Sequence, residues 1–402
     1  MTKEKVIPQI RFSGFTDTWE QRKLGDTVQI TMGQSPDGST YSDVPSDYIL
    51  VQGNADLQNG WVSPRVWTSQ MTKKADAGDL IMSVRAPAGA MGKTAYNAVI
   101  GRGVAAIKGN EFIYQLLEKM DSDGYWKALS CGSTFESLNS DNIKNADVLI
   151  PDVAEQEKIG EYFLAIDRLI TLHQRKYDKL TKVKKAMLEK MFPENGSLYP
   201  EIRFKGFTDA WEQRKLSDMV ERVTRKNENR ESELPLTISA QYGLIDQNEF
   251  FDKRIASRDV SGYYLLKKGE FAYNKSTSSD APWGAVKRLD RYEMGVLSTL
   301  YIVFALKENG NIDSDFLVSY YDTDCWHKGV QAIAAEGARN HGLLNITPAD
   351  YFETVLTVPS DVKEQHQIGS FFAKLDTLIT LHQRKLEKLK NIKKACLEKM
   401  FV

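Results

Sequence analysis

Apolar residues recur at alternating steps of four and three in two distant parts of the chain. The first stripe comprises Ile159, Phe163, Ile166, Ile170, His173, Tyr177 and Leu180, and the second comprises Ile368, Phe372, Leu375, Ile379, His382, Leu386 and Leu389. Such a pattern over about three heptads predicts a long amphipathic helix with a coiled-coil seam in each part. Pro151, Pro359 and Pro193 lie at the expected limits, because proline breaks a helix interior. A helix from about residue 160 to about residue 192 would be about 45–50 Å long.

Two blocks of sequence occur twice in the chain. Residues 8–24 return 192 residues later with three differences in 17 positions, and residues 155–192 return 209 residues later with 24 of 38 positions identical. The octapeptide from Leu169 to Lys176 is unchanged in the second copy. The sequence between the blocks mostly differs, so the chain is constant–variable–constant twice. Matching constant blocks can build one pseudo-symmetric frame, on which the variable regions act on different targets.

The two predicted helices should pair with each other, and they should be antiparallel if a two-fold axis relates the two halves. Stripe positions then form the seam of the pair. We predict a helix-pair core composed of Ile166, Ile170, His173, Leu375, Ile379 and His382. A histidine at a stripe position is more typical of a packed core side chain than of a ligand or a catalyst.

The variable regions, residues 25–150 and 217–358, contain short β-rich runs separated by turn residues. The runs are Tyr48–Val51, Asp79–Val84, Gly103–Ile107, Phe271–Tyr273, Gly284–Val286 and Leu300–Phe304. A helix is predicted after each set, at Glu111–Met120 and at Asp315–Thr323. Short strands mixed with helices predict a mixed α/β domain in each region.

The whole pattern predicts an α+β protein with a pseudo-two-fold internal repeat. Two mixed α/β domains are expected to be joined by a pair of long antiparallel coiled-coil helices. The expected boundaries are 1–151 for the first variable domain with its constant segment, 152–195 for the first helix, 196–359 for the second variable domain with its lead-in, and 360–402 for the second helix. Trp19 and Trp211 lie in constant blocks, and we expect both to pack the frame.

Composition is typical of a folded protein, and it requires any nucleic-acid site to be built from local charge. Apolar residues are 42% and charged residues 27%, which is ordinary for a globular chain. No apolar run approaches the ~18–20 residues of a membrane helix, and no secretory signal is visible. Three scattered cysteines, Cys131, Cys325 and Cys396, exclude a disulfide framework and favour a cytoplasmic location. The net charge is −1, so positive charge must be arranged locally for a nucleic-acid partner.

Catalytic motifs are weak or absent in the sequence. Gly101–Ala106 fits a dinucleotide-binding string but continues into a predicted strand, and no P-loop is present. Asp280–Trp283 resembles an amino-methyltransferase site with alanine in place of the first proline, and Glu155–Lys158 has the wrong spacing for a nuclease. Five histidines and three cysteines show no metal-ligand spacing. We therefore predict no catalytic residue, metal site or cofactor in this chain.

Polar and cationic side chains occur in loops at matching places of the two variable regions. Ser83–Pro87 and Asn274–Ser279 follow matching strands, while Ser133-Thr134 and Arg339–His341 precede the constant helices at comparable distances. Side chains of these types read base edges and bind phosphates. Their recurrence in two differing copies indicates DNA binding more strongly than any single residue does.

The order and duplication of these motifs resemble the specificity subunit of type I restriction-modification systems. In the first half the resemblance rests on Gly33–Pro36, Gly78–Pro87, Ser133–Phe135, Pro151 and Glu155-Gln156; in the second it rests on Gly269–Asn274, Asn345-Ile346, Pro359 and Glu364-Gln365. One departure is Asn274-Lys275-Ser276 where the first half has Ser83-Val84-Arg85. The resemblance covers nearly the whole chain.

The resemblance implies that each variable region is a target recognition domain for one half of a bipartite DNA sequence. The helices would fix the distance between the halves and dock two modification subunits, which carry S-adenosylmethionine and methylate adenine. Restriction subunits, which use ATP and magnesium, would join this core. The specificity subunit itself would be non-catalytic, with no cofactor, no metal and no membrane partner.

The DNA-binding candidates come from the polar loops of the two domains. They are Gln34, Ser35, Arg65, Arg85, Lys93, Ser133 and Thr134 in the first domain, and Asn274, Lys275, Ser276, Arg339, Asn340 and His341 in the second. Two other functions stay open at this point. An autonomous DNA methyltransferase or nuclease would require Asp280–Trp283 to be active. A coiled-coil interaction scaffold would have no DNA role, and charge reversal at Arg85 or Lys275 would leave its function unchanged.

Overall fold

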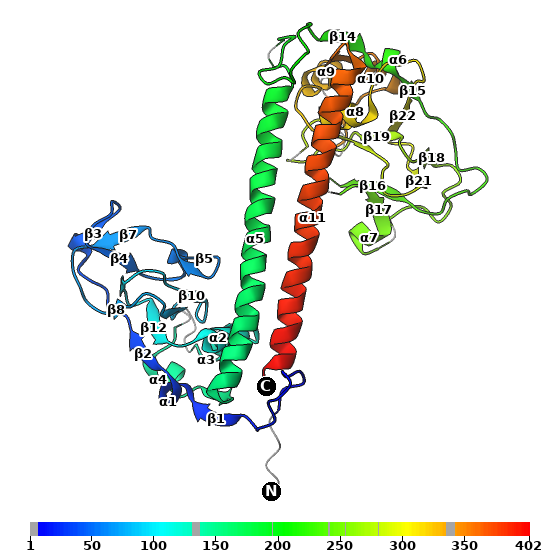
Figure 1. The fold of residues 1–402 in the computed structure, drawn as a ribbon. Helices are drawn as coiled ribbons and strands as arrows, with labels where there is room; N and C mark the ends of the chain where they lie inside the picture. Colours follow the sequence, from blue (N-terminus) through cyan, green and yellow to red (C-terminus); the bar gives the residue numbers. More distant parts are fainter. Residues whose placement is uncertain are drawn as a thin grey trace. The chain divides into compact units, whose positions relative to one another are not determined.

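Two compact units make up the chain, and each contains parts of both long helices (Figure 1). The computed structural model describes residues 7–130, 137–194, 196–239, 242–253, 255–279, 281–334 and 342–402. The first unit comprises Met1–Lys176 with His382–Val402, and the second comprises Tyr177–Leu381. One variable region therefore shares each unit with segments of both constant helices.

Two helices of 39 residues form the constant part of the fold. α5 spans Val153–Met191 and α11 spans Val362–Met400, so each is about 58 Å long at 1.5 Å per residue. Both begin several residues before the apolar stripe that predicted them. The reason is local capping, because Asp152 accepts a hydrogen bond from the backbone N–H of Glu155, and Asp361 accepts one from Lys363.

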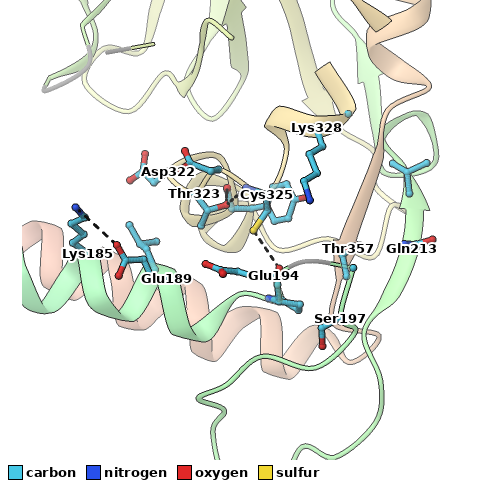
Figure 2. A pocket seen from close by; sticks show the side chains of 17 residues that line it. Lys185, Glu189, Glu194, Ser197, Gln213, Asp322, Thr323, Cys325, Lys328 and Thr357 are labelled. Carbon is cyan, nitrogen blue, oxygen red and sulfur yellow. Dashed lines mark hydrogen bonds and ion pairs between the residues drawn. The ribbon is translucent and has the colours of Figure 1, made fainter. Parts of the chain in front are cut away.

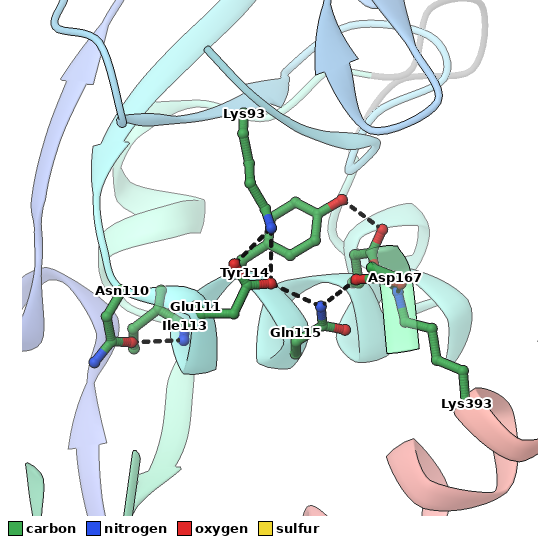
Figure 3. Close-up of polar contacts among 9 residues, drawn as sticks. Lys93, Asn110, Glu111, Ile113, Tyr114, Gln115, Asp167 and Lys393 are labelled. Atoms are coloured by element: carbon green, nitrogen blue, oxygen red, sulfur yellow. Dashed lines mark hydrogen bonds and ion pairs between the residues drawn. The ribbon is translucent and has the colours of Figure 1, made fainter. Parts of the chain in front are cut away.

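In the first unit, α5 and α11 run antiparallel. Tyr162 on α5 lies 3.4 Å from the sulfur of Cys396, and Asp167, further along α5, lies 2.8 Å from Lys393, which precedes Cys396 on α11. Lys393 also lies 2.7 Å from Glu118 of α2, Glu111–Ser122 (Figure 3). One ammonium group thus joins three helices, and we call this contact the lysine clip of the first unit.

The second unit contains the matching lysine clip. Lys184 on α5 lies 2.7 Å from Asp376 on α11 and 2.8 Å from Asp322, which follows α8, Ser314–Tyr321. Lys184 and Asp376 are 209 residues from Lys393 and Asp167, the offset of the constant helices. Phe192, just after α5, packs on Phe372 of α11 with 5.9 Å between ring centroids. The predicted antiparallel pairing is therefore confirmed within each unit.

Short strands and helices build the variable region of the first unit. Its elements are β1 (Glu20–Lys23), α1 (Leu24–Thr27), β2 (Gln29–Met32), β3 (Tyr41–Ser42), β4 (Tyr48–Val51), β5 (Leu57–Gln58), β6 (Trp61–Val62), β7 (Val66–Thr68), β8 (Lys74–Ala75), β9 (Leu80–Ser83), β10 (Met91–Lys93), β11 (Ala98–Ile100), β12 (Val104–Lys108), α2, α3 (Tyr125–Leu129), α4 (Ser140–Lys144) and β13 (Asp147–Ile150). The strand orders are β1-β13, β2-β12-β9-β10-β6-β5 and β3-β7-β4-β11-β8.

The second unit has a related set of elements. They are β14 (Glu212–Lys215), α6 (Leu216–Met219), β15 (Val220–Arg222), β16 (Leu236–Ser239), β17 (Gly243–Asp246), α7 (Gln247–Phe251), β18 (Tyr264–Lys267), β19 (Phe271–Asn274), β20 (Ala285–Arg288), β21 (Met294–Leu297), β22 (Ile302–Leu306), α8, α9 (His327–Ile333), α10 (Pro348–Phe352) and β23 (Val355–Val358). The strand orders are β14-β23, β15-β22-β19-β20, β16-β17 and β18-β21.

The central strands of both units are buried on both faces. In β9, Leu80 and Met82 join the core beneath α2, whereas Ile81 joins the core on the opposite face. In β19, Phe271 and Tyr273 alternate with Ala272 in the same way. Alternation along a strand sends neighbouring side chains to opposite faces, so these strands appear in the sequence as continuous apolar runs. The predicted fold class is confirmed.

The constant blocks anchor each unit through the same buried contacts. Arg11 forms a bidentate ion pair with Glu155 at 2.6 and 2.7 Å, and Arg203 forms one with Glu364 at the same distances. Both carboxylates are buried, and the ion pairs raise the pKa of Arg11 and of Arg203 above the usual value. Trp211 packs edge-on against Phe192, and Trp19 packs in the same way against Phe401. The predicted frame-packing role of the two tryptophans is thus confirmed.

Substitution of Glu364 by glutamine should destabilise the second unit far more than a matched change at the surface. Loss of one partner of a buried ion pair leaves a buried charge and costs about 3–5 kcal/mol. The exposed Arg22–Glu20 pair provides the control, because Glu20→Gln should cost less than about 1 kcal/mol. Urea unfolding followed by circular dichroism measures both variants. Equal shifts of the two midpoints would contradict a structural role for the buried pair.

Candidate nucleic-acid interface

The end of β9 carries Arg85 to one edge of the first unit. The backbone N–H of Val84 donates to the carbonyl of Gly103 at 2.9 Å, and the carbonyl of Val84 accepts from Leu138 at 2.9 Å. Arg85 itself forms an isolated antiparallel bridge with Ser137. The exposed Arg85 side chain is therefore presented by a backbone that is paired on both sides.

The second unit repeats this arrangement with different side chains. The carbonyl of Lys275 accepts from the backbone N–H of Leu344 at 3.0 Å, and Ser276 forms an antiparallel bridge with Leu343. Ser276 is 191 residues after Arg85, which is the offset that aligns β19 with β9. Equivalent backbone positions thus carry an arginine in one unit and a serine in the other, as expected for domains that recognise different targets.

Five of the predicted DNA-binding residues lie outside the described residues, and they belong to two segments, 131–136 and 335–341. These residues are Ser133, Thr134, Arg339, Asn340 and His341. The described residues that follow the two segments most closely are Ser137 and Gly342. Ser137 pairs with Arg85, and the carbonyl of Gly342 accepts from the backbone N–H of Thr277 at 2.8 Å. In each unit the described residue that follows the segment in sequence therefore pairs with the predicted loop after the central strand.

The loop that contains Gln34 and Ser35 lies against the turn between β11 and β12. The backbone N–H of Gln34 donates to the carbonyl of Ile100 at 2.8 Å, and Ser35 Oγ accepts from the backbone N–H of Arg102 at 3.2 Å. A Cβ on Gly33 would lie only 2.1 Å from the carbonyl oxygen of Gly101, so the two backbones are closely packed. Gln34 is exposed, whereas Ser35 is half-buried and holds the turn.

Arg102 is an exposed residue of this edge that the sequence prediction missed. Its two flanking glycines were considered only as part of a dinucleotide-binding string. The structure shows why glycine is needed there, because a Cβ on Gly103 would lie 2.0 Å from the carbonyl oxygen of Gln52. A cation between two glycines in a turn was the available signal, and close backbone packing rather than phosphate binding explains Gly103.

In the second unit, two of the candidates mainly shape their own loop. Asn274 Oδ1 accepts a hydrogen bond from the backbone N–H of Ser276 at 3.0 Å. Lys275 is half-buried, and its Nζ donates to the carbonyl of Ile346 at 3.3 Å. Ser276 is exposed. Of these three residues, Ser276 has the side chain that is most accessible to a ligand.

Arg65 is already engaged by an acidic group. Its Nε and Nη2 donate to one carboxylate oxygen of Asp56 at 3.0 and 2.7 Å. Asp56 is buried, and its other oxygen accepts from the backbone N–H groups of Gln52 and Gly53. The guanidinium of Arg65 therefore stabilises a buried turn, although nearly half of its side chain remains exposed.

Lys93 was predicted to bind DNA, and the structure corrects this prediction. The side chain is buried, and its Nζ lies 2.6 and 2.7 Å from the two carboxylate oxygens of Glu111 and 4.0 Å from the ring centroid of Tyr114 (Figure 3). Gln115 extends the network from Glu111 to Asp167 on α5. Exposing Lys93 to a phosphate would leave Glu111 unpaired, so this lysine supports the fold instead.

The predicted helix-pair core is buried to different degrees along its length. Ile166 and Leu375 are buried, whereas Ile170 and Ile379 are half-buried. His173 and His382 are also half-buried, and their Nδ1 atoms lie 2.8 Å apart in the first unit. One imidazole must donate to the other at this distance. The two histidines occupy the same position of the repeat, as contacts on a pseudo-two-fold axis require.

The histidine pair should make stability depend on pH. Burial lowers the pKa of both imidazoles, and the positive charges of Lys176 and Lys385 lower it further. A histidine whose pKa is lower in the folded state than in the unfolded state binds more protons when the chain unfolds. Its contribution to the free energy of unfolding is therefore retained above about pH 6.5 and lost as the pH falls. The urea midpoint should therefore fall more in the wild type than in a His173→Gln, His382→Gln double variant between about pH 7.5 and 5.5. Parallel pH profiles would contradict this role.

A cavity of about 480 Å³ lies in the second unit between the end of α5 and the segment that follows α8 (Figure 2). Lys185 and Glu189 of α5 line it, together with Asp322 and Cys325. The thiol of Cys325 donates to the carbonyl of Pro193 at 3.6 Å, and burial raises the pKa of this thiol. A thiol that stays protonated is a poor nucleophile, so the cavity gives no argument for covalent catalysis.

Other chemistry was searched for in the part of the chain that the structure describes. Within those residues, no group of three or more His, Cys, Asp or Glu side chains is arranged to hold a metal ion. The helices of the same residues include none that combines the length and the apolar character needed to cross a membrane. Cys325 and Cys396 are free thiols, while Cys131 and Asp280 lie outside the described residues.

Comparison with known proteins gives a consistent result. The family described as "Type I restriction modification DNA specificity domain" matches residues 16–182. Two curated relatives come from Methanocaldococcus jannaschii. The putative type I restriction enzyme MjaX specificity subunit is 29% identical over 194 residues, which are 46% of this chain and 45% of that protein. The type I restriction enzyme MjaIX specificity subunit is 23% identical over 224 residues, or 50% of this chain and 51% of that protein.

The aligned part of the chain spans about half the length of these curated relatives. The fold, in contrast, is matched along nearly its whole length. The crystal structure of the S subunit of a type I restriction-modification system from M. genitalium has a TM-score of 0.68 at 13% identity. The match covers 98% of this chain and 99% of that one. At this low identity the likeness shows the shared fold.

Proposed function

We propose that this chain is a specificity subunit of a type I restriction-modification system, and that each of its two units reads one half of a bipartite target in double-stranded DNA. The observation that carries the proposal is the repeat of one frame with two different edges. Arg85 in the first unit and Ser276 in the second occupy equivalent bridge positions beside equivalent backbone partners. Two units with the same backbone frame but different side chains at the edge suit two half-sites of different sequence.

The edge of each unit has the polar side chains that base reading requires. Hydrogen bonds to base edges carry sequence information, whereas contacts to phosphates mainly position the protein. In the first unit the exposed Gln34, Arg85 and Arg102 belong to neighbouring backbone segments. In the second unit Ser276 pairs with Leu343, and the candidates Arg339, Asn340 and His341 precede Leu343 in the sequence.

The long helices are proposed to fix the distance between the two half-sites. Major-groove sites one helical turn apart are about 34–36 Å from centre to centre. Each helix is about 58 Å long, and each unit contains segments of both helices. A change of helix length would then change the number of unread base pairs between the half-sites.

Exposed leucines on the long helices are proposed to dock two modification subunits. Leu169 and Leu172 on α5 are 44% and 46% exposed, and Leu378 and Leu381 on α11 are both 43% exposed. All four belong to the octapeptide that is identical in the two helices. Clustered apolar exposure of this kind marks an interaction surface, and two identical surfaces fit two copies of one partner.

The chain is proposed to be non-catalytic, with the chemistry supplied by its partners. S-adenosylmethionine would belong to the modification subunits, and ATP with magnesium to the restriction subunits. The description of the matching family as a DNA specificity domain, and the naming of the curated relatives as specificity subunits, support this division. Purified on its own, the chain should methylate no DNA.

Mapping of methylated adenines tests the proposed function directly. The full chain is expressed with a compatible modification subunit in a host that lacks adenine methylation, and methylated positions are found by single-molecule sequencing. A split motif with a fixed unread gap is expected, because two separate units contact the duplex. A purified complex of the two proteins that leaves the DNA unmethylated would contradict DNA reading and favour the scaffold function.

Charge placed on the exposed leucines should remove one modification subunit per altered helix. A Leu169→Glu, Leu172→Glu variant is expected to bind one copy where the wild type binds two, because a buried carboxylate would oppose docking. Light scattering of the purified complex measures the stoichiometry. Thr181→Glu, an exposed change elsewhere on α5, is the control and should keep two copies. Two copies bound to the leucine variant would place the docking surface elsewhere.

A further inference from the structure

Ion pairing separates the cations of the first recognition region into two groups. Residues 28–110 contain seven lysines and arginines. Four of these form ion pairs with carboxylates, and they are Arg65 with Asp56, Lys74 with Asp76, Lys93 with Glu111, and Lys108 with Asp76. The other three, Lys73, Arg85 and Arg102, are exposed and form no ion pair with any described residue.

The three cations without an ion pair belong to adjoining backbone segments. The carbonyl of Lys73 accepts from the backbone N–H of Ile100 at 2.8 Å, two residues before Arg102. Gly103, the next residue, accepts from the backbone N–H of Val84, which directly precedes Arg85. Lys108, in contrast, lies at the far end of β12 from Arg102. Within this region, positive charge that the fold does not use is concentrated at one edge.

The turn that presents Arg102 is fixed from both sides. The backbone N–H of Gly101 donates to the carbonyl of Val51 at 2.8 Å, that of Arg102 donates to Ser35 Oγ at 3.2 Å, and that of Val104 donates back to Gly101 at 3.1 Å. The close packing at Gly33 and Gly103 leaves no room for a side chain at either position. Because this backbone is already ordered in the folded protein, it adds no further ordering cost when Arg102 binds, which favours precise recognition.

We propose that Arg102 is a specificity-determining residue that reads a guanine of the half-site recognised by the first unit, while Lys73 contacts a phosphate of the same half-site. This inference rests on the proposed function. Arginine can donate two parallel hydrogen bonds to O6 and N7 of guanine in the major groove. Lysine is a flexible point charge that suits a phosphate. Arg85 adds positive charge to the same edge.

Four variants of the full chain, each with its modification subunit, test this division of roles. The variants are Arg102→Ala, Arg102→Lys, Lys73→Ala and the control Lys108→Ala, whose lysine is exposed but paired with Asp76. Thermal unfolding confirms that each variant is folded. Methylated motifs are mapped by sequencing, and binding to duplexes that carry the motif or a single base change is measured at several salt concentrations.

Both Arg102 variants should relax one base of one half-site. Discrimination at that base should fall about 5- to 100-fold, the range for one bidentate contact, and lysine should not restore it because it lacks the bidentate geometry. Lys73→Ala should keep the motif, weaken binding to all duplexes alike, and reduce the salt-dependence slope by about 1. Lys108→Ala should match the wild type.

Two results would overturn the inference. Unchanged discrimination in Arg102→Ala, with a reduced salt slope, would make Arg102 a phosphate contact. Wild-type behaviour of both Arg102→Ala and Lys73→Ala would show that DNA does not lie on this edge. Failure of the proposed function is distinguished from both, because a wild-type complex would then give no split motif at all.

Discussion

Each lysine clip ties the two long helices to the variable region of its unit, through α2 in the first unit and through Asp322 at the end of α8 in the second, and the rest of the structure depends on these contacts. Burial alone would lower the pKa of Lys393 and of Lys184, but the carboxylates around each ammonium group outweigh burial and raise both pKa values. A buried ammonium group that loses its carboxylate partners is costly in free energy. Separation of the variable region from the helix pair would remove one of these partners, so the clip opposes it. Each clip takes its lysine from one long helix, and one of its acids comes from the other long helix, so both halves of the sequence are needed to complete either unit.

This constraint explains how one frame can carry two edges with different exposed side chains. The clips, the Arg11–Glu155 and Arg203–Glu364 pairs and the tryptophan contacts recur at the repeat offsets. They lie among buried residues, where a substitution lowers the stability of the fold. The edge residues differ, because side chains such as Arg85 and Ser276 are exposed while their backbone is paired. A side chain there can change without altering the backbone, so specificity can vary while the frame stays the same.

Sequence patterns predicted the parts of the fold that depend on local periodicity or on the repeat. The heptad stripes gave the long helices, the apolar runs gave β9 and β19, and the repeat offset placed His173 opposite His382. The position of Lys93 could not be predicted, because its burial depends on Glu111 in a following helix, and a lysine at the end of a strand looks the same in the sequence whether it faces solvent or the core. Arg102 was missed for the opposite reason, since its flanking glycines match a known motif, and only the packing of three backbone segments shows their structural purpose.

The central claim is that the helix pair sets the distance between two half-sites that the units read independently. Duplication of one heptad in both helices, residues 171–177 and 380–386, keeps the seam in register and both pairs of exposed leucines, and it lengthens each helix by about 10 Å. The methylated motif of this variant, mapped by single-molecule sequencing beside that of the wild type, is the most direct measurement. The same two half-sites are expected with a gap longer by about three base pairs, given about 3.4 Å per base pair. Both half-sites with an unchanged gap would contradict the central claim.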